Sequence, residues 1–214
     1  MPFRDCIGHQ QSIALLQAAF THKRLAHAYL FHGEEAIGKR LTAICLAQAL
    51  SCEQPPEAEG LDSCGVCRSC QQIEARTHPD FFVIEPDQEQ ATQQIKIEQV
   101  REIEHQIMYR PLIGERKICL INDADRMTIG AANALLKTLE EPPAHSLFLV
   151  ISSRPAALPA TIRYSNSRHS SGPLNSGVRR EGLRRINLAR RRSAVKKYAV
   201  QPANFRFSRS PSCG

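Results

Sequence analysis

Residues 117–143 read KICLINDADRMTIGAANALLKTLEEPP, and this stretch decides the fold. It begins with an apolar run at 118–121 that is long enough for a strand and ends abruptly on Asn122 and Asp123. A strand that is apolar along its whole length is typical of a parallel sheet covered on both faces. We therefore expect a buried parallel strand that carries polar side chains to the carboxyl edge of the sheet, where they can hold a metal ion or orient water.

A phosphate-loop motif lies upstream of this stretch. Residues 33–39 read GEEAIGK, follow a short apolar run at 29–31 and precede a helical pattern at 40–50. In a GxxxxGK loop the glycines let the backbone approach a phosphate, and the lysine, here Lys39, reaches the outer phosphates. Together with the strand at 118–121, this order predicts an α/β P-loop NTPase fold, a parallel sheet flanked by helices.

Other segments fit the same layout. Residues 12–20 have helical periodicity, and Ser12 is expected to cap the start of that helix. Short apolar runs predict strands at 81–84 and 147–151, and residues 95–108 predict a further helix with one apolar side.

Four cysteines are spaced as ligands of one metal ion. Cys52, Cys64, Cys67 and Cys70 form the pattern C-x11-C-x2-C-x2-C. Tight C-x2-C steps bring thiolates close enough to share one tetrahedral ion, and four sulfur ligands favour zinc and leave no open position for catalysis. We predict a structural zinc module at about 52–70, with an iron-sulfur cluster or free thiols as the alternatives.

The chain resembles a known family at these motifs. The block ANALLKTLEEPP at 132–143, placed after a Walker-B-like strand, resembles the clamp-loader branch of the AAA+ ATPases, and within it the delta-prime subunits of bacterial DNA polymerase III. The resemblance covers residues 1–163 and includes the cysteine module, which these subunits carry as an insertion after the first helix of the fold. In this family Cys6 to His9 resembles the segment beside the adenine base, and Ser152 and Ser153 stand where a polar sensor residue is placed.

The residues needed for ATP hydrolysis depart from the P-loop and family patterns. An active P-loop enzyme has Ser or Thr after the lysine to bind magnesium, whereas this chain has Arg40, and the hydroxyl of Thr42 lies on a different face of the helix. The family places Asp and then Glu at the Walker-B position, where this chain has the degenerate pair Asn122 and Asp123. We expect no ATPase activity and assign no catalytic residue.

Nucleotide binding is a separate expectation. Gly33, Gly38, Lys39 and Arg40 form the candidate nucleotide-binding residues, and the loop keeps enough of a phosphate cradle to bind ATP or ADP weakly. The alternative is a strand-to-helix turn that is retained for structure and binds no nucleotide.

Residues 164–214 differ sharply from the rest of the chain. Of the 28 basic and 21 acidic residues, 12 basic and one acidic residue lie in this segment, which gives it a charge of +11 and leaves −4 on residues 1–163. The segment is rich in Arg and Ser and has no sustained periodicity. We interpret it as a basic, disordered tail or as a frame-shifted continuation; the latter is favoured because the resemblance stops inside a motif. The family's lid and collar domains are not recognisable.

The resemblance implies a subunit of the bacterial clamp loader, which helps place the sliding clamp on primed DNA during replication. Its partners would be the gamma/tau and delta subunits in a hetero-oligomeric ring. It would be a component of a DNA-directed DNA polymerase, a nucleotidyltransferase holoenzyme, without a polymerase site of its own.

Two other functions remain open: an ATP-hydrolysing subunit of the gamma/tau type, and a zinc-containing nucleic-acid-binding protein. No signal peptide or membrane-length apolar run is present in the sequence, and Cys45 and Cys119 lie on apolar elements, which suits a reducing compartment. We expect a cytoplasmic location and no membrane contact.

Overall fold

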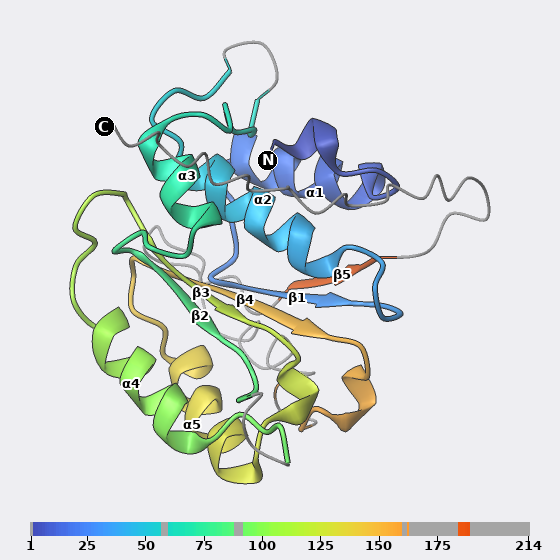
Figure 1. Ribbon diagram of the computed structural model, residues 1–214, viewed down its shortest axis with the longest axis vertical. Coiled ribbons are helices and arrows are strands. Elements are labelled where there is room, and N and C mark those ends of the chain that lie inside the picture. The colour runs from blue at the N-terminus through green and yellow to red at the C-terminus, as the bar shows by residue number, and fades with distance from the viewer. Residues whose placement is uncertain (1, 57–59, 88–91, 160–161, 163–183, 189–214) are drawn as a thin grey trace, which may run out of the picture.

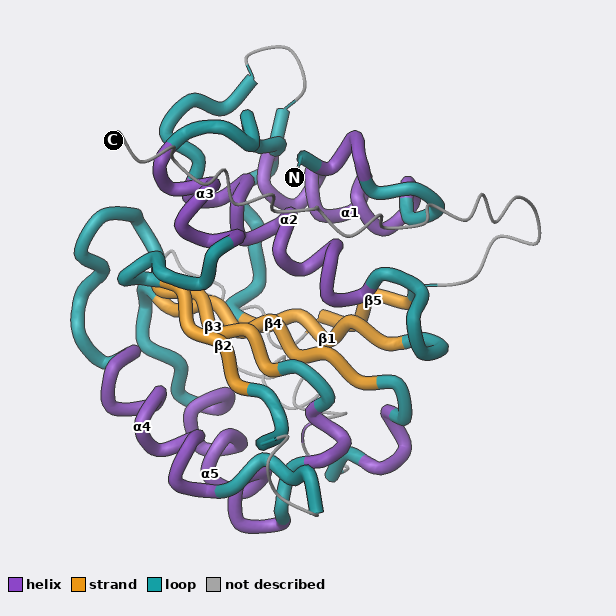
Figure 2. Tube along the Cα trace, viewed as in Figure 1, coloured by secondary structure: helices purple, strands orange, loops and turns teal. Residues whose placement is uncertain are grey.

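Within the part of the chain that the structure describes, five strands pair in parallel to form one sheet. The structure is a computed structural model, and it describes residues 2–56, 60–87, 92–159, 162 and 184–188. The strand order across the sheet is β2-β3-β4-β1-β5 (Figure 2). The strands are β1 (Ala28–His32), β2 (Phe81–Ile84), β3 (Lys117–Ile121), β4 (Ser146–Ser152) and β5 (Arg184–Asn187).

Helices cover both faces of the sheet (Figure 1). One face carries α1 (Gln10–Thr21), α2 (Lys39–Ser51) and α3 (Arg68–Glu74), and the other carries α4 (Ile97–Ile107) and α5 (Ile129–Glu140). Short 3-10 helices add η1 (Phe3–Asp5), η2 (Ala124–Arg126) and η3 (Pro155–Ala157).

The central strands are apolar throughout because both of their faces are covered. Every residue of β3 and β4 is buried, and side chains from these strands enter two apolar clusters, one under each helical layer. The predicted α/β fold with a parallel sheet flanked by helices is therefore confirmed. The strands predicted at 29–31, 81–84, 118–121 and 147–151 are all present, with small differences at their ends.

Helix α5 begins at Ile129, three residues before the block ANALLKTLEEPP at 132–143. Thr128 is its N-cap, and the Thr128 hydroxyl oxygen accepts a hydrogen bond from the backbone N–H of Ala131 at 3.2 Å. The helix ends at Glu140, just before the two prolines at 142–143, because proline cannot continue the backbone hydrogen bonding of a helix.

Ser12 is not the N-cap that the sequence predicted. The N-cap position of α1 is His9, and Ser12 lies buried inside the helix. Its hydroxyl instead donates a hydrogen bond to the backbone carbonyl of Asn187, at the end of β5, at 3.3 Å. Ser12 therefore makes a long-range hydrogen bond to β5 and not the local capping hydrogen bond that was predicted.

Residues 184–188 depart from the expectation of a disordered tail. Arg184–Asn187 pairs in parallel with β1, Ile186 is buried against the core, and Leu188 donates its N–H to the carbonyl of His32 at 2.9 Å. The expectation of disorder is wrong for these residues, because Ile186 and Leu188 are both buried and the backbone pairs with β1 despite the neighbouring arginines. The rest of the segment 164–214 lies outside the described residues.

None of the helices in the described ranges is long and apolar enough to cross a membrane.

Candidate functional site

The phosphate-loop sequence forms the turn between β1 and α2. Gly38, the N-cap of α2, has a φ of 93°, in the left-handed region that favours glycine. At Gly33 a side chain carbon would lie 2.2 Å from the carbonyl oxygen of Leu188, so that a substitution there would clash with backbone. Both predicted glycines are therefore needed by the fold of the loop itself, whether or not it binds a phosphate.

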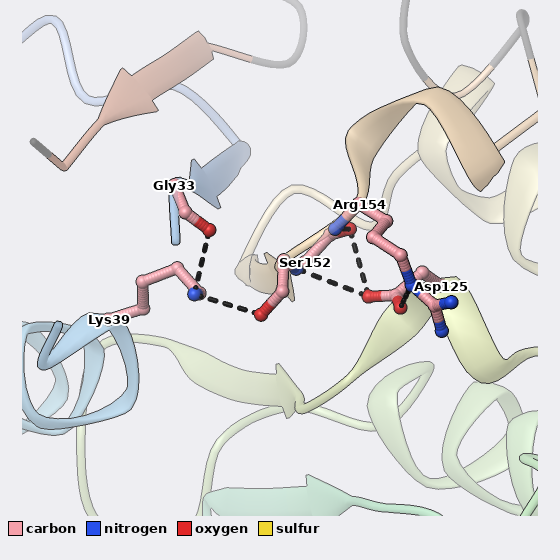
Figure 3. A network of polar contacts seen from close by, with 6 residues as sticks. Gly33, Lys39, Asp125, Ser152 and Arg154 are labelled. Atoms are coloured by element: carbon pink, nitrogen blue, oxygen red, sulfur yellow. Dashed lines mark hydrogen bonds and ion pairs between the residues drawn. The ribbon is translucent and has the colours of Figure 1, made fainter. Parts of the chain in front are cut away.

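Lys39 reaches back across this loop (Figure 3). Its Nζ donates hydrogen bonds to the carbonyl of Gly33 at 3.0 Å, to the carbonyl of Glu34, and to the hydroxyl of Ser153 at 3.0 Å. Burial lowers the pKa of Lys39, and the nearby carboxylates of Asp123 and other acids partly oppose this effect. The structure thus brings Lys39 and the predicted sensor segment together at the carboxyl edge of the sheet.

Arg40, the residue after the lysine, forms an ion pair outside the phosphate loop. The guanidinium of Arg40 forms an ion pair with Glu85 at 3.3 Å, just beyond the end of β2, and Glu85 also pairs with Arg76. The hydroxyl of Thr42 is buried and donates to the carbonyl of Gly38 at 3.0 Å. Neither Arg40 nor Thr42 therefore offers a hydroxyl to a metal ion beside the loop.

The Walker-B position holds a self-paired amide and carboxylate. Asn122 Nδ2 donates to Asp123 Oδ2 at 3.2 Å, and Asp123 has a φ of 50°, in the left-handed region. Burial raises the pKa of Asp123, and the charge of Arg126 opposes this increase. The pair supplies one carboxylate where two are needed to hold magnesium and orient water.

Asp125, two residues beyond the Walker-B pair, has partners at the end of β4 that no local sequence pattern predicts. A charge near the start of a helix is the ordinary role of such a residue. Its carboxylate instead accepts hydrogen bonds from the hydroxyl of Ser152 at 3.0 Å and the backbone N–H of Ser153 at 3.2 Å, and it pairs with Nε of Arg154 at 3.2 Å (Figure 3). Burial opposes ionisation, but these donors outweigh it and lower the pKa of Asp125.

The four cysteines of the predicted module converge at the far end of α2. Their sulfur atoms all lie within 4.8 Å of one another, and the Sγ atoms of Cys52 and Cys67 are 4.0 Å apart. A zinc ion with Zn–S bonds of about 2.3 Å needs ligand sulfurs about 3.8 Å apart. The donor set and its spacing therefore fit one tetrahedral ion.

Backbone hydrogen bonds already orient these sulfurs. The N–H groups of Cys64, Cys67 and Cys70 donate to the sulfurs of Cys52, Cys64 and Cys67 at 3.3, 3.2 and 3.5 Å. Burial disfavours the Cys64 thiolate, but hydrogen bonds from the Val66 and Cys67 backbone, with those of neighbouring thiols, lower its pKa to about 7. Burial raises the pKa of Cys52 and of Cys70. A bound cation would favour the thiolate form of all four ligands.

Comparison with known proteins agrees with this architecture. Residues 8–171 match the family model described as DNA polymerase III, delta subunit. This match covers the phosphate loop, the cysteine cluster and the LLKTLEEPP block, and it continues a little beyond the limit of 163 that the sequence suggested.

Curated relatives include two delta-prime subunits and several tau subunits. The chain is 44% identical over 138 residues to DNA polymerase III subunit delta' of Pseudomonas aeruginosa, which covers 64% of this chain and 40% of that protein. It is 36% identical over 158 residues to the delta' subunit of Escherichia coli K12, covering 74% and 46%. With subunit tau of Salmonella typhimurium it shares 37% identity over 160 residues, covering 75% and 24%. The chain thus spans less than half the length of these relatives.

Among solved structures, a DNA polymerase III gamma subunit-related protein from Thermotoga maritima has the same fold. The TM-score is 0.56 at 24% sequence identity, and the alignment covers 85% of this chain and 47% of that one. Family match, delta-prime relatives and fold thus agree with the family predicted from the phosphate loop and the LLKTLEEPP block. The chain belongs to the DNA polymerase III delta-subunit family and is a delta-prime-type member of it.

Proposed function

We propose that this chain serves as a clamp-loader subunit of bacterial DNA polymerase III and helps place the sliding clamp on primed DNA. The observation that carries the proposal is the match of residues 8–171 to the delta-subunit family, together with 44% identity to a delta' subunit. The proposed partners are gamma/tau and delta subunits in one ring, with contact to the clamp and DNA through that complex, in the cytoplasm.

Its own nucleotide site is proposed to be hydrolytically silent. Arg40 is committed to an ion pair with Glu85, the Thr42 hydroxyl is tied to a backbone carbonyl, and Asn122 replaces a charged ligand. Placement of metal and water contributes several kcal/mol of barrier lowering, and each loss of about 1.36 kcal/mol slows the reaction roughly tenfold. The glycine loop and Lys39 remain compatible with weak binding of ATP or ADP.

The cysteine cluster is proposed to hold one structural zinc ion. Cys52, Cys64, Cys67 and Cys70 supply four sulfurs, the number that closes a tetrahedral site and leaves no position for a reacting water. The ion would fasten the end of α2 to α3. We propose residues 1–163, with this module inserted, as the AAA+ domain; the character of the segment 164–214 stays a prediction apart from β5.

An ATPase assay tests the silent site. The purified chain, supplied with ATP and magnesium, with and without primed DNA, is expected to show no turnover above that of the Lys39→Ala variant. Robust hydrolysis that Lys39→Ala abolishes would favour the second candidate, a motor subunit of the gamma/tau type, which the 37% identity to a tau subunit supports.

Reconstitution tests the partner proposal independently. The chain is expected to co-elute with gamma/tau and delta subunits on size exclusion, and the complex is expected to load clamps on primed DNA. Failure to enter the ring, with a folded chain confirmed by circular dichroism, would contradict the clamp-loader role even if the ATPase result held.

A further inference from the structure

Two cysteines outside the metal cluster meet in the core beneath the phosphate-loop helix. Cys6 follows η1 near the start of the chain, and Cys45 lies in the middle of α2. Their sulfur atoms are 3.2 Å apart, closer than the Cys52 and Cys67 sulfurs, and both residues are unlinked thiols. A disulfide bond has an S–S length of about 2.05 Å, so a shift of roughly 1.2 Å would join them.

The pair is buried but lies at the edge of a hollow. Cys45 is fully buried and Cys6 is 5% exposed. Cys6 also lines a hollow of about 410 Å³ whose other walls include Arg4, Gln10 and Asp62. Cys6 is therefore the member of the pair that borders a hollow, whereas Cys45 is fully enclosed.

The less buried thiol of the pair, Cys6, is also the more acidic one. A hydrogen bond from the Cys45 thiol lowers the pKa of Cys6, against the effects of burial and of the Asp5 and Asp62 carboxylates. The same hydrogen bond, followed by burial, raises the pKa of Cys45. The more accessible sulfur is thus the better nucleophile, and the enclosed one keeps its proton.

We propose that Cys6 and Cys45 are a redox site that closes to a reversible disulfide when a peroxide reaches Cys6. The Cys6 thiolate attacks a peroxide oxygen, the O–O bond breaks, and hydroxide leaves, which gives a sulfenic acid. The Cys45 thiol then attacks the Cys6 sulfur, loses its proton, and expels the sulfenic oxygen as water. Two thiols are oxidised by two electrons, hydrogen peroxide is reduced to two waters, and a cellular dithiol reverses the bond.

The disulfide would fasten the N-terminal segment to the helix that begins at Lys39. This segment already contacts the phosphate loop, because His9 Nε2 forms a hydrogen bond with the carbonyl of Ile37. Oxidation would therefore fix the register between His9 and α2, while the metal-binding cysteines stay outside the bond.

The test is to treat the full zinc-loaded chain with stoichiometric hydrogen peroxide and to map its disulfides without reduction. Chymotrypsin is suitable because cleavage after Leu46 or Leu50 separates Cys45 from Cys52. We expect a peptide pair that joins Cys6 to Cys45, is lighter by two hydrogens than the separate peptides, and disappears on reduction. Cys119→Ala serves as the matched control, because Cys119 is another fully buried thiol and its loss should leave the pair intact.

Melting curves give a second readout. Peroxide treatment is expected to raise the melting temperature of the wild type roughly 5–10 °C more than it raises that of a Cys6→Ala variant, since the bond closes a long loop in the unfolded chain. This comparison cancels any effect of peroxide on the four clustered cysteines. The proposal is overturned if Cys6 and Cys45 of the treated wild type both remain open to alkylation in denaturant, or if either is joined to a different cysteine.

Discussion

Helix α2 has a candidate site at each end, and the two ends have kept their chemistry to different degrees. At its start, Lys39 and the glycine loop remain, but the metal-binding hydroxyl and one carboxylate are absent. At its other end, Cys52 follows the last residue of the helix and meets three further cysteines, which makes a complete ligand set. The start of α2 therefore departs from the pattern that ATP hydrolysis requires, whereas the four sulfurs at its other end fit a single tetrahedral ion.

The largest change in stability should come from the cysteine cluster at the C-terminal end of α2. Replacing Cys67 with Ser is expected to release one zinc per chain and to lower the free energy of unfolding by about 4 kcal/mol or more, because binding of a structural zinc contributes directly to folding. Elemental analysis and denaturant melts measure the two quantities. The control Cys119→Ala removes a buried thiol from β3 and should retain the metal. A wild-type chain that can be freed of metal without any change in its melting curve would contradict a structural role for zinc at this end of α2.

A smaller change in stability is expected near the phosphate loop, where Asp125 and Asp123 should differ in how much they stabilise the fold. Asp125→Asn is expected to cost about 2 kcal/mol at neutral pH, because Ser152, Ser153 and Arg154 lose a charged acceptor. Asp123→Asn, two positions away, should change the free energy of unfolding by less than about 0.5 kcal/mol, since burial disfavours the charge that it removes. Urea melts of both variants provide the measurement.

The pH dependence of stability in the same two variants shows whether each carboxyl stabilises the fold in its charged or its neutral form. The lowered pKa of Asp125 contributes stability that is present above its ordinary value of 3.8 and is lost as the pH falls through the folded-state pKa. The raised pKa of Asp123 acts in the opposite sense: its contribution is present below 3.8 and is lost as the pH rises through the folded-state value. Asp125→Asn should therefore flatten the fall of stability in acid; a steeper fall would show that Asp125 is not ionised in the folded chain.

Replacing Arg40 should also have only a small effect on stability. Its ion pair with Glu85 is about one-third exposed on each side, so Arg40→Thr should cost only about 0.5 kcal/mol. A double-mutant cycle with Glu85→Gln isolates the pair from the Arg76 contact. A coupling free energy above about 1.5 kcal/mol would mean that Arg40 is a main support of this end of the helix.

The sequence was most informative where the signal is local. The apolar runs of β1, β3 and β4 and the spacing of the four cysteines each lie within a short stretch, so the strands and the convergence of the cysteines could be predicted directly. The partners of Asp125 come from the end of β4, and the partner of Arg40 lies beyond β2, which no local pattern indicates. Edge strand β5 was missed because the neighbouring arginines hide its single buried position, Ile186.

The strand order has a consequence for synthesis of the chain on the ribosome. β1 is made early, yet both of its neighbours, β4 and β5, come more than a hundred residues later. At about 5–20 residues per second, an apolar strand with two open edges waits roughly 6–24 s for β4 to emerge. Until then its backbone hydrogen-bonding groups, and the side chains that are buried in the folded chain, face solvent or a chaperone, so an unpaired β1 is a segment at which a nascent chain can associate with another.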